Sequence, residues 1–263
     1  MPDSNTQHLD VGTGADRRRI AVLRDAGRPP GLLWLPGFKS DMVSTKATAL
    51  SDWAREKGLA CTRFDYSGHG QSEGRFEDGT VGRWLEETRA VFTRMTEGPV
   101  IVVGSSMGGY IALLLLRQLM AEAPEEASRI KALVLIAPAW DMTEELMWKE
   151  FPEDVKREIT EKGVWLRPSA YGEPYPITRE LIEEGRKHLI GRQAWDPGRP
   201  VHILHGLQDP DVPWQHTVEL EKNLTGGWTR VTAVPDGDHR LSRPEDLNLL
   251  CDVIGQLAET EKQ

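Results

Sequence analysis

The sequence contains little cysteine, no long hydrophobic run and no excess of positive charge. Its 263 residues include two cysteines, Cys61 and Cys251, and no grouping of cysteine and histidine fits a metal site. Both cysteines lie in apolar or helical patterns, so we expect buried thiols, as in a reducing compartment. No apolar run reaches the roughly 20 residues that span a bilayer. The formal net charge of −9 gives no support for a nucleic-acid or anionic-membrane partner.

The first 20 residues have the features of neither common type of targeting peptide. They contain no apolar core, which a secretory signal requires, and they carry acidic residues, which mitochondrial transit peptides avoid. We therefore expect a cytoplasmic protein. A length of 263 residues is normal for one α/β domain that carries an insertion, and the sequence contains no repeat and no low-complexity tract.

What the sequence does contain is a regular alternation of short apolar runs and longer segments with helical spacing. Such alternation predicts a mostly parallel sheet with helices on both faces, here as a single domain over residues 1–263. Strands are expected to begin near residues 18, 31, 59, 99, 130, 200 and 229. Helices are expected at residues 46–58, 80–95 and 245–259 and in the second half of the segment 99–122.

Residues 140–196 interrupt this alternation with a segment rich in tryptophan, glutamate and proline. Two pieces, near 150–162 and 177–190, have helical spacing. A segment of this length between two core strands is typical of a cap over a site, or of a peripheral decoration without a role. We expect the former, a small helical cap. Four tryptophans lie in or beside it and either shape an apolar pocket or pack the cap: Trp140, Trp148, Trp165 and Trp195.

One short motif carries the clearest chemical signal. Residues 104–108 form a G-x-S-x-G pattern with Ser106 at its centre. The flanking glycines let a strand and a helix approach closely, while the central serine takes a strained turn that exposes its hydroxyl at the helix N-terminus. The apolar runs before and after the motif supply that strand and helix. The alternative, a Ser-Gly turn of a nucleotide-binding fold, requires a lysine or a G-x-G-x-x-G pattern, and neither is here.

A nucleophilic serine needs a base, and five histidines follow Ser106 in the sequence. His239 lies in a loop directly after the last predicted strand, where the catalytic groups of parallel sheets gather, and is the predicted base. His69, which precedes the serine, is typical of a turn after a strand, with a place at the site entrance as the alternative. The other four are expected to be structural or solvated: His188, His202, His205 and His216.

The acid that orients the histidine is expected between the serine and the histidine in the sequence. The loop after the strand near residue 200 offers Asp209 and Asp211. Asp209 lies closer to the strand end and is the preferred candidate, whereas Asp211 is expected to cap the helix that follows. Asp236 and Asp238 lie too close to His239 in the sequence to reach its Nδ1, and they are typical of a turn.

Two backbone N–H groups are expected to form an oxyanion hole, which stabilises the charge that develops on the attacked carbonyl oxygen. By position in the motif, one is the N–H of Met107, directly after the serine. The second is the N–H of Phe38, in the loop that follows the strand near residue 31. The pattern indicates no cofactor and no metal.

Several longer stretches of the sequence together resemble one known family. They read "LLWLPGFKSDM", "CTRFDYSGHGQSEG", "GSSMGGY", "GVWLRPS", "HGLQDPDVPW" and "DHRLSRPEDL". From about residue 18 to residue 258 the chain is similar to the small α/β-hydrolases whose animal member is the mitochondrial acyl-protein thioesterase, also known as mycophenolic acid acyl-glucuronide esterase. The transit peptide of that member is missing, so the chain looks like a bacterial, cytoplasmic relative.

The resemblance implies an α/β-hydrolase fold with a triad of Ser106, Asp209 and His239, in agreement with the positional argument. It also implies hydrolysis of a small-molecule acyl ester or thioester, with an S-acylated protein as a further substrate. Two alternatives stay open. One is another reaction on the same scaffold, such as C–C bond or peptide hydrolysis, and the other is a hydrolase fold that only binds a ligand.

Overall fold

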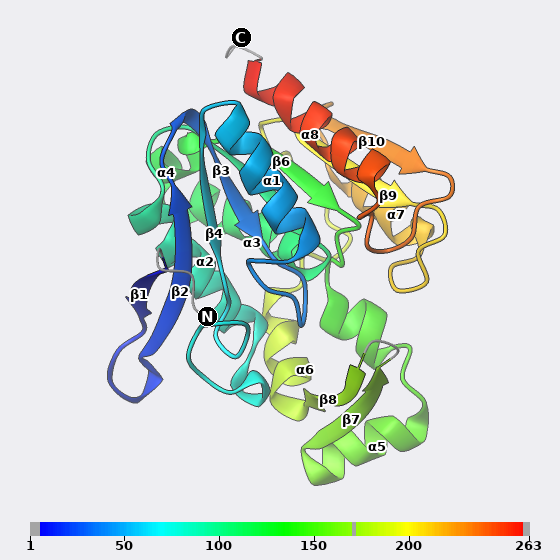
Figure 1. The fold of residues 1–263 in the computed structure, drawn as a ribbon. Helices are drawn as coiled ribbons and strands as arrows, with labels where there is room; N and C mark the ends of the chain where they lie inside the picture. The colour runs from blue at the N-terminus through cyan, green and yellow to red at the C-terminus, as the bar shows by residue number, and fades with distance from the viewer. Residues whose placement is uncertain (1–5, 170–171, 260–263) are drawn as a thin grey trace.

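The computed structural model describes residues 6–169 and 172–259, which form a large twisted sheet, helices around it and a smaller lobe on one side (Figure 1). The main sheet has the strand order β1-β2-β4-β3-β5-β6-β9-β10. β2 pairs antiparallel with β1 and β4, and the other neighbouring strands pair parallel, so the predicted mostly parallel sheet is confirmed. Its strands are β1 (Gln7–Val11), β2 (Arg18–Asp25), β3 (Arg28–Leu35), β4 (Leu59–Phe64), β5 (Val100–Ser105), β6 (Ile130–Ile136), β9 (Val201–Gly206) and β10 (Thr229–Val234).

Helices cover both faces of this sheet, as the alternation predicted. α1 (Thr45–Glu56) and α8 (Pro244–Glu259) lie together on one face, in front of the sheet in Figure 1. The remaining helices of the main body pack on the opposite face. They are α2 (Val81–Met95), α3 (Met107–Glu122), α4 (Pro124–Arg129) and α7 (Trp214–Asn223), and single 3₁₀ turns occur at Gly14–Asp16 and Phe76–Asp78.

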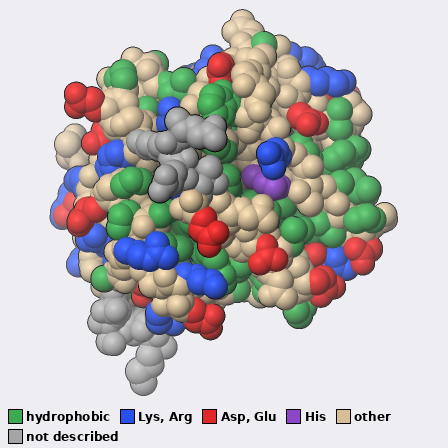
Figure 2. Space-filling view, turned by 90° about the horizontal axis from the view of Figure 1, so that it is seen from above, with side chains coloured by type: hydrophobic (Ala, Val, Ile, Leu, Met, Phe, Trp, Pro, Cys, Tyr) green, Lys and Arg blue, Asp and Glu red, His purple; other side chains and the backbone are tan. Residues whose placement is uncertain are grey.

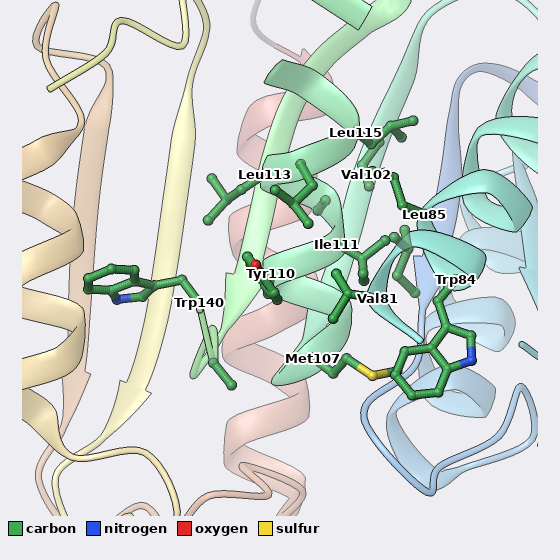
Figure 3. Packing of buried hydrophobic residues seen from close by; sticks show 14 of the residues in the cluster. Val81, Trp84, Leu85, Val102, Met107, Tyr110, Ile111, Leu113, Leu115 and Trp140 are labelled. Atoms are coloured by element: carbon green, nitrogen blue, oxygen red, sulfur yellow. The ribbon is translucent and has the colours of Figure 1, made fainter. Parts of the chain in front are cut away.

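The core has two halves because the central strands are buried on both faces. On β5, Val100 and Val102 point towards the half with α2 and α3, while Ile101 and Val103 point towards the half with α1 and α8. Figure 3 shows the α3 side, where side chains of α3 pack against those of α2 and β5. Each fully buried aliphatic side chain contributes about 2 kcal/mol, so the long apolar run of α3 anchors the turn at its N-terminus.

Two features of the main sheet were not predicted. β1 was missed because the five residues Gln7–Val11 contain only two apolar residues, Leu9 and Val11, too few to establish an alternation. β3 begins at Arg28, although the sequence predicts a start near residue 31. The prediction was late because Pro29 and Pro30, which donate no hydrogen bond, argue against a strand but lie inside β3. The ladder to β4 is irregular at that point, between Arg28 and Leu32.

The lobe in the lower right of Figure 1 belongs to the segment 140–196 and is not wholly helical. Helices were expected near 150–162 and 177–190, and α5 (Glu153–Lys162) and α6 (Arg179–Gly185) lie there, followed by a 3₁₀ turn at Arg186–His188. Between them is an antiparallel hairpin of β7 (Val164–Ser169) and β8 (Gly172–Thr178), which was not predicted. A stretch of π-helix, Thr143–Trp148, joins the lobe to β6.

No helix in the described ranges has the length and apolar character needed to cross a membrane. Cys61 is buried in β4, as expected, and burial raises the pKa of its thiol to about 12. Cys251 in α8 is only half-buried, in contrast to the expectation, and desolvation raises the pKa of its thiol to about 11. Both thiols therefore stay protonated at neutral pH.

Candidate active site

Ser106 occupies the sharp turn between β5 and α3. Its φ of 54° and ψ of −116° lie in a region that L-residues rarely adopt. Hydrogen bonds hold it there: its N–H donates to the carbonyl of Ile136 at 2.8 Å, and its carbonyl accepts from the N–H of Ala139 at 3.1 Å. The backbone is strained but fully anchored, which fixes the direction of the hydroxyl.

Glycines surround this turn because three backbone segments meet there. A Cβ atom on Gly104 would lie 2.3 Å from the carbonyl oxygen of Gly108, and one on Gly108 would lie 2.1 Å from that of Leu35. A Cβ on Gly37 would lie 3.3 Å from the carbonyl oxygen of Ser105. The glycines of the motif thus let β3, β5 and α3 approach within van der Waals distance, as the sequence analysis expected.

The hydroxyl of Ser106 faces the loop that follows β10. Its Oγ lies 3.1 Å from Nε2 of His239, and Nδ1 of the same ring lies 2.7 Å from Oδ2 of Asp209. The Asp209 side chain is fully buried, whereas that of His239 is 21% exposed. The structure therefore brings together the three side chains that sequence reasoning selected, at the carboxyl ends of β5, β9 and β10.

Asp209 is held in place by its own loop. Its Oδ1 accepts hydrogen bonds from the N–H groups of Asp211 at 2.8 Å and Val212 at 2.9 Å, which leaves Oδ2 for the histidine. Asp211 is exposed and does not cap α7, which begins after Pro213 without a side-chain cap, so that prediction was wrong. Proline at this point sets the backbone for helix entry without help from the aspartate.

Asp236 and Asp238 stabilise the loop that carries His239. Oδ1 of Asp238 accepts the N–H groups of Arg240 and Leu241, both at 3.0 Å, as expected of a turn-forming aspartate. Asp236 forms a salt bridge with Arg243 at 2.7 Å. Neither carboxylate contacts the ring of the histidine, so both act on the loop.

The two predicted oxyanion donors belong to residues at the start of α3 and directly after β3. Met107 is the first residue of α3, so its N–H has no acceptor within the helix, and Phe38 lies in the turn after β3. In the described ranges neither N–H donates a hydrogen bond to the protein. Both N–H groups are therefore free to donate to a ligand.

His69 stabilises the loop that carries Phe38. Its Nε2 accepts the N–H of Lys39 at 3.1 Å, and its Nδ1 lies 3.1 Å from the carbonyl of Ser67. The ring is buried, and burial lowers the pKa of the imidazole, which keeps Nε2 neutral and able to accept. His69 therefore serves more than its own turn, a role that the sequence analysis did not foresee.

The other histidines pair with groups away from the serine. His188 was expected to be solvated, but it is half-buried and lies 2.5 Å from a carboxylate oxygen of Glu184. His202 contacts a threonine hydroxyl of β10, and His205 lies between Thr217 and a backbone carbonyl. His216 bonds to the carbonyl of Trp140 at 2.8 Å. None of the four reaches Ser106.

A cavity of about 610 Å³ opens next to Ser106 and His239. The segment after β6 and the β7 strand supply one part of its wall, and the loops after β3 and β10 supply another. Its size fits a drug-sized ligand. The apolar lining residues are Trp34, Phe38, Ala139, Met142, Leu146, Met147, Pro168, Tyr175 and Val212.

The four tryptophans of the 140–196 segment do not line this cavity. Trp140 is buried and stacks on His216, with ring centres 4.5 Å apart. Trp165 packs edge-on against Phe151, and the Trp148 ring lies below the guanidinium of Arg186. Trp148 and Trp165 thus pack within the lobe, whereas Trp140 and Trp195 contact the main body, at His216 and Leu224. Met142, Leu146 and Met147 line the cavity instead. Flexible methionine side chains suit a pocket wall that adapts to its ligand.

Comparisons with known proteins identify relatives over nearly the whole chain. The palmitoyl-protein thioesterase ABHD10, mitochondrial, of Bos taurus is 34% identical over 248 residues, which cover 93% of this chain and 78% of the relative. Among solved structures, a putative hydrolase from Agrobacterium vitis S4 superposes with a TM-score of 0.93 at 43% identity, covering 97% of this chain and 98% of that one. Alpha/beta hydrolase domain-containing protein 10 from mouse superposes with a TM-score of 0.83 at 32% identity, with the same coverage.

The family model of the alpha/beta hydrolase family matches residues 29–248, which is most of the chain. The eight-stranded sheet, the strained serine turn after β5 and the order serine, aspartate, histidine along the chain all have the form that this fold requires. The chain belongs to the alpha/beta hydrolase family.

Proposed function

We propose that the chain is a serine hydrolase that cleaves carboxylic esters or thioesters through an acyl-enzyme. The observation that carries the proposal is the hydrogen-bonded series from Ser106 Oγ to His239 Nε2, at 3.1 Å, and from His239 Nδ1 to Asp209 Oδ2, at 2.7 Å. The two free N–H groups and the adjoining cavity support it. The relatives named palmitoyl-protein thioesterase support a long-chain acyl thioester as the natural class of substrate.

In the first half of the reaction, Ser106 Oγ attacks the acyl carbon while His239 Nε2 takes the hydroxyl proton. The carbonyl oxygen becomes an oxyanion, which the N–H groups of Phe38 and Met107 hold. Asp209 keeps the proton of His239 on Nδ1 and stabilises the imidazolium. When the tetrahedral intermediate collapses, the leaving oxygen or sulfur takes the proton from His239, and the acyl group stays on Ser106.

The second half repeats these steps with water. His239 removes a proton from a water molecule, whose oxygen attacks the acyl carbon of the ester on Ser106. The same oxyanion donors act again. The intermediate then releases the carboxylic acid, and the proton on His239 returns to Ser106 Oγ, which restores the starting state.

We also propose that residues 140–196 form a cap within the single domain. The segment supplies Met142, Leu146 and Met147 to the cavity wall and returns to the main body near Ile190. Its two ends are joined, since the carboxylate of Asp141 accepts the N–H of Ile190 at 2.7 Å. An acyl chain would lie between this wall and the serine.

The two adjacent serines allow a direct test. A fluorophosphonate probe should label the wild type and Ser105→Ala, and it should fail to label Ser106→Ala, because only Ser106 lies beside His239. Labelling is measured by intact-mass spectrometry. An unlabelled wild type would contradict the enzyme proposal and favour a fold that only binds a ligand.

The substrate class is tested with acyl thioesters and p-nitrophenyl esters whose chain length varies. Turnover should persist with long chains, because the cavity next to Ser106 has a volume of about 610 Å³ and an apolar wall. Turnover of short chains alone would contradict the acyl-protein thioesterase assignment and leave a general esterase. Aminoacyl amides and C–C bond substrates, which distinguish the alternative hydrolase reactions, are expected to be inert.

A further inference from the structure

Basic residues outnumber acidic ones around the cavity, whereas acidic residues outnumber basic ones in the whole chain. The sequence has 32 Lys and Arg residues against 41 Asp and Glu residues. In the described part of the chain, four basic residues and a single carboxylate, that of Asp211, line the cavity. On the face turned away from the cap, Figure 2 shows acidic and basic side chains interspersed. The basic lining residues are Lys39, Lys46, Arg167 and Arg240.

Two of these cations extend over aromatic rings at the rim of the cavity. Nζ of Lys39 lies 4.5 Å from the centre of the Tyr175 ring, and the guanidinium of Arg167 lies 6.0 Å from that of Phe151. Neither side chain forms a salt bridge with a carboxylate of the described residues. Aromatic rings hold a cation in place but leave its charge unneutralised.

Lys46 lies deeper, in the first turn of α1. Its Nζ donates to the backbone carbonyl of Arg240 and lies 3.4 Å from Oγ of Ser242, which are both uncharged acceptors. Burial and the nearby guanidinium of Arg240 lower the pKa of Lys46 to about 8, against weaker opposing effects of Asp238 and Asp246. At pH 7 the ammonium is therefore charged, while its two acceptors are neutral, so an anion placed next to it would be stabilised.

The lining also differs in polarity from one wall to the other. Met142, Leu146 and Met147 come from the cap and present apolar side chains. The loops after β3 and β10 and the first turn of α1 present the hydroxyl groups of Ser40, Ser44, Thr45 and Ser242 and the cations Lys39, Lys46 and Arg240. Arg167 adds a further cation from β7, on the side of the lobe. An acyl chain on the apolar wall directs the other half of an ester towards the polar wall, because Ser106 lies between them.

We propose that Lys46 and Lys39 of the polar wall, together with Arg167 of β7, bind an anionic leaving group, a carboxylate or a phosphate. The inference rests on the proposed function, since the leaving group is defined by the ester or thioester that Ser106 cleaves. It adds a specificity: an acyl ester of an anionic alcohol or thiol is preferred over the neutral ester of the same acyl chain.

Three octanoyl esters test this at pH 7: those of ethylene glycol, glycolic acid and 2-hydroxyethyl phosphate. They share the acyl chain and differ in the charge of the leaving group. The measured quantity is the ratio of kcat/KM for each anionic ester to that for the neutral ester, compared between variant and wild type so that intrinsic reactivity cancels. Lys46→Met and Arg167→Met should each lower at least one ratio by about tenfold.

Lys57→Met is the matched control, since Lys57 is exposed at the other end of α1 and should leave both ratios within twofold of the wild type. Lys46→Arg, which keeps the charge, should retain most of the preference. A fall of the phosphate ratio alone assigns a phosphate, and a fall of both assigns anions in general. Thermal melting checks that each variant folds. Lys46 and Arg167 lie on separate segments, so if one variant is unstable the other still tests the inference.

The outcomes separate the inference from the function on which it rests. Hydrolysis of all three esters with ratios unaffected by Lys46→Met and Arg167→Met would overturn the anion site and leave the serine hydrolase standing. Hydrolysis of none of the three would overturn the proposed function, and the inference with it.

Discussion

At the residue scale, the two aspartates of one loop have different expected roles. Only Asp209 reaches the histidine, through Oδ2 at 2.7 Å from Nδ1 of His239, whereas Asp211 is exposed. Asp209→Asn should lower kcat for a p-nitrophenyl ester by about 10⁴-fold, because the amide favours the wrong tautomer of the histidine. Asp211→Asn should lower it by less than about tenfold. Equal losses in the two variants would contradict the assignment.

The reacting residues could be found in the sequence because their order along the chain and their places after strands are fixed by the fold. The cations of the cavity could not. Lys39 and Arg240 directly follow the predicted site residues Phe38 and His239, but no spacing in the sequence relates Lys46 and Arg167 to them or to each other. Only the packing of the cap and two loops around Ser106 brings them to one surface.

At the scale of elements, α3 meets β3 so closely that Gly108 tolerates no side chain. In Gly108→Ala the new Cβ would lie 2.1 Å from the carbonyl oxygen of Leu35, so the free energy of unfolding should fall by about 3 kcal/mol. In the control, Gly255→Ala in α8, the new Cβ would lie 3.5 Å from Trp53, and helix propensity should add about 0.5–1 kcal/mol. Urea unfolding measures both, and a destabilised Gly255→Ala with an unaffected Gly108→Ala would refute the packing argument.

All strands of the main sheet except β1 were predictable, because their apolar runs are bounded by glycines and loops, whereas the hairpin of β7 and β8 was not. Pro174 and Pro176 lie inside β8 and argue against a strand on local grounds. A two-stranded hairpin consists of edges alone, so these prolines face no second partner in it. The local signal and the tertiary context therefore disagree here.

At the scale of the whole molecule, the change in folding stability at acid pH is the sum of opposing contributions from different groups. Burial lowers the pKa of several histidines, which makes the fold less stable as the pH falls; they are His69, His202, His205 and His216. Burial raises the pKa of several carboxyl groups, which has the opposite effect; they are Asp65, Glu87 and Asp141. The melting curve of the wild type alone cannot separate these contributions, so a variant is needed that removes one of them.

His216 is suited to this, since burial lowers its pKa from 6.5 to about 4 and it joins α7 to the start of the segment 140–196 at Trp140. The unfolded state binds the proton more tightly, so this stability is complete above pH 6.5 and is lost progressively as the pH falls towards 4. His216→Gln keeps a donor for the carbonyl of Trp140 but does not titrate. Between pH 8 and pH 5 the wild type should lose about 2 kcal/mol more unfolding free energy than the variant, as measured by urea titration. If the difference in unfolding free energy between the wild type and His216→Gln stays constant over this range, the titration of His216 is not coupled to folding.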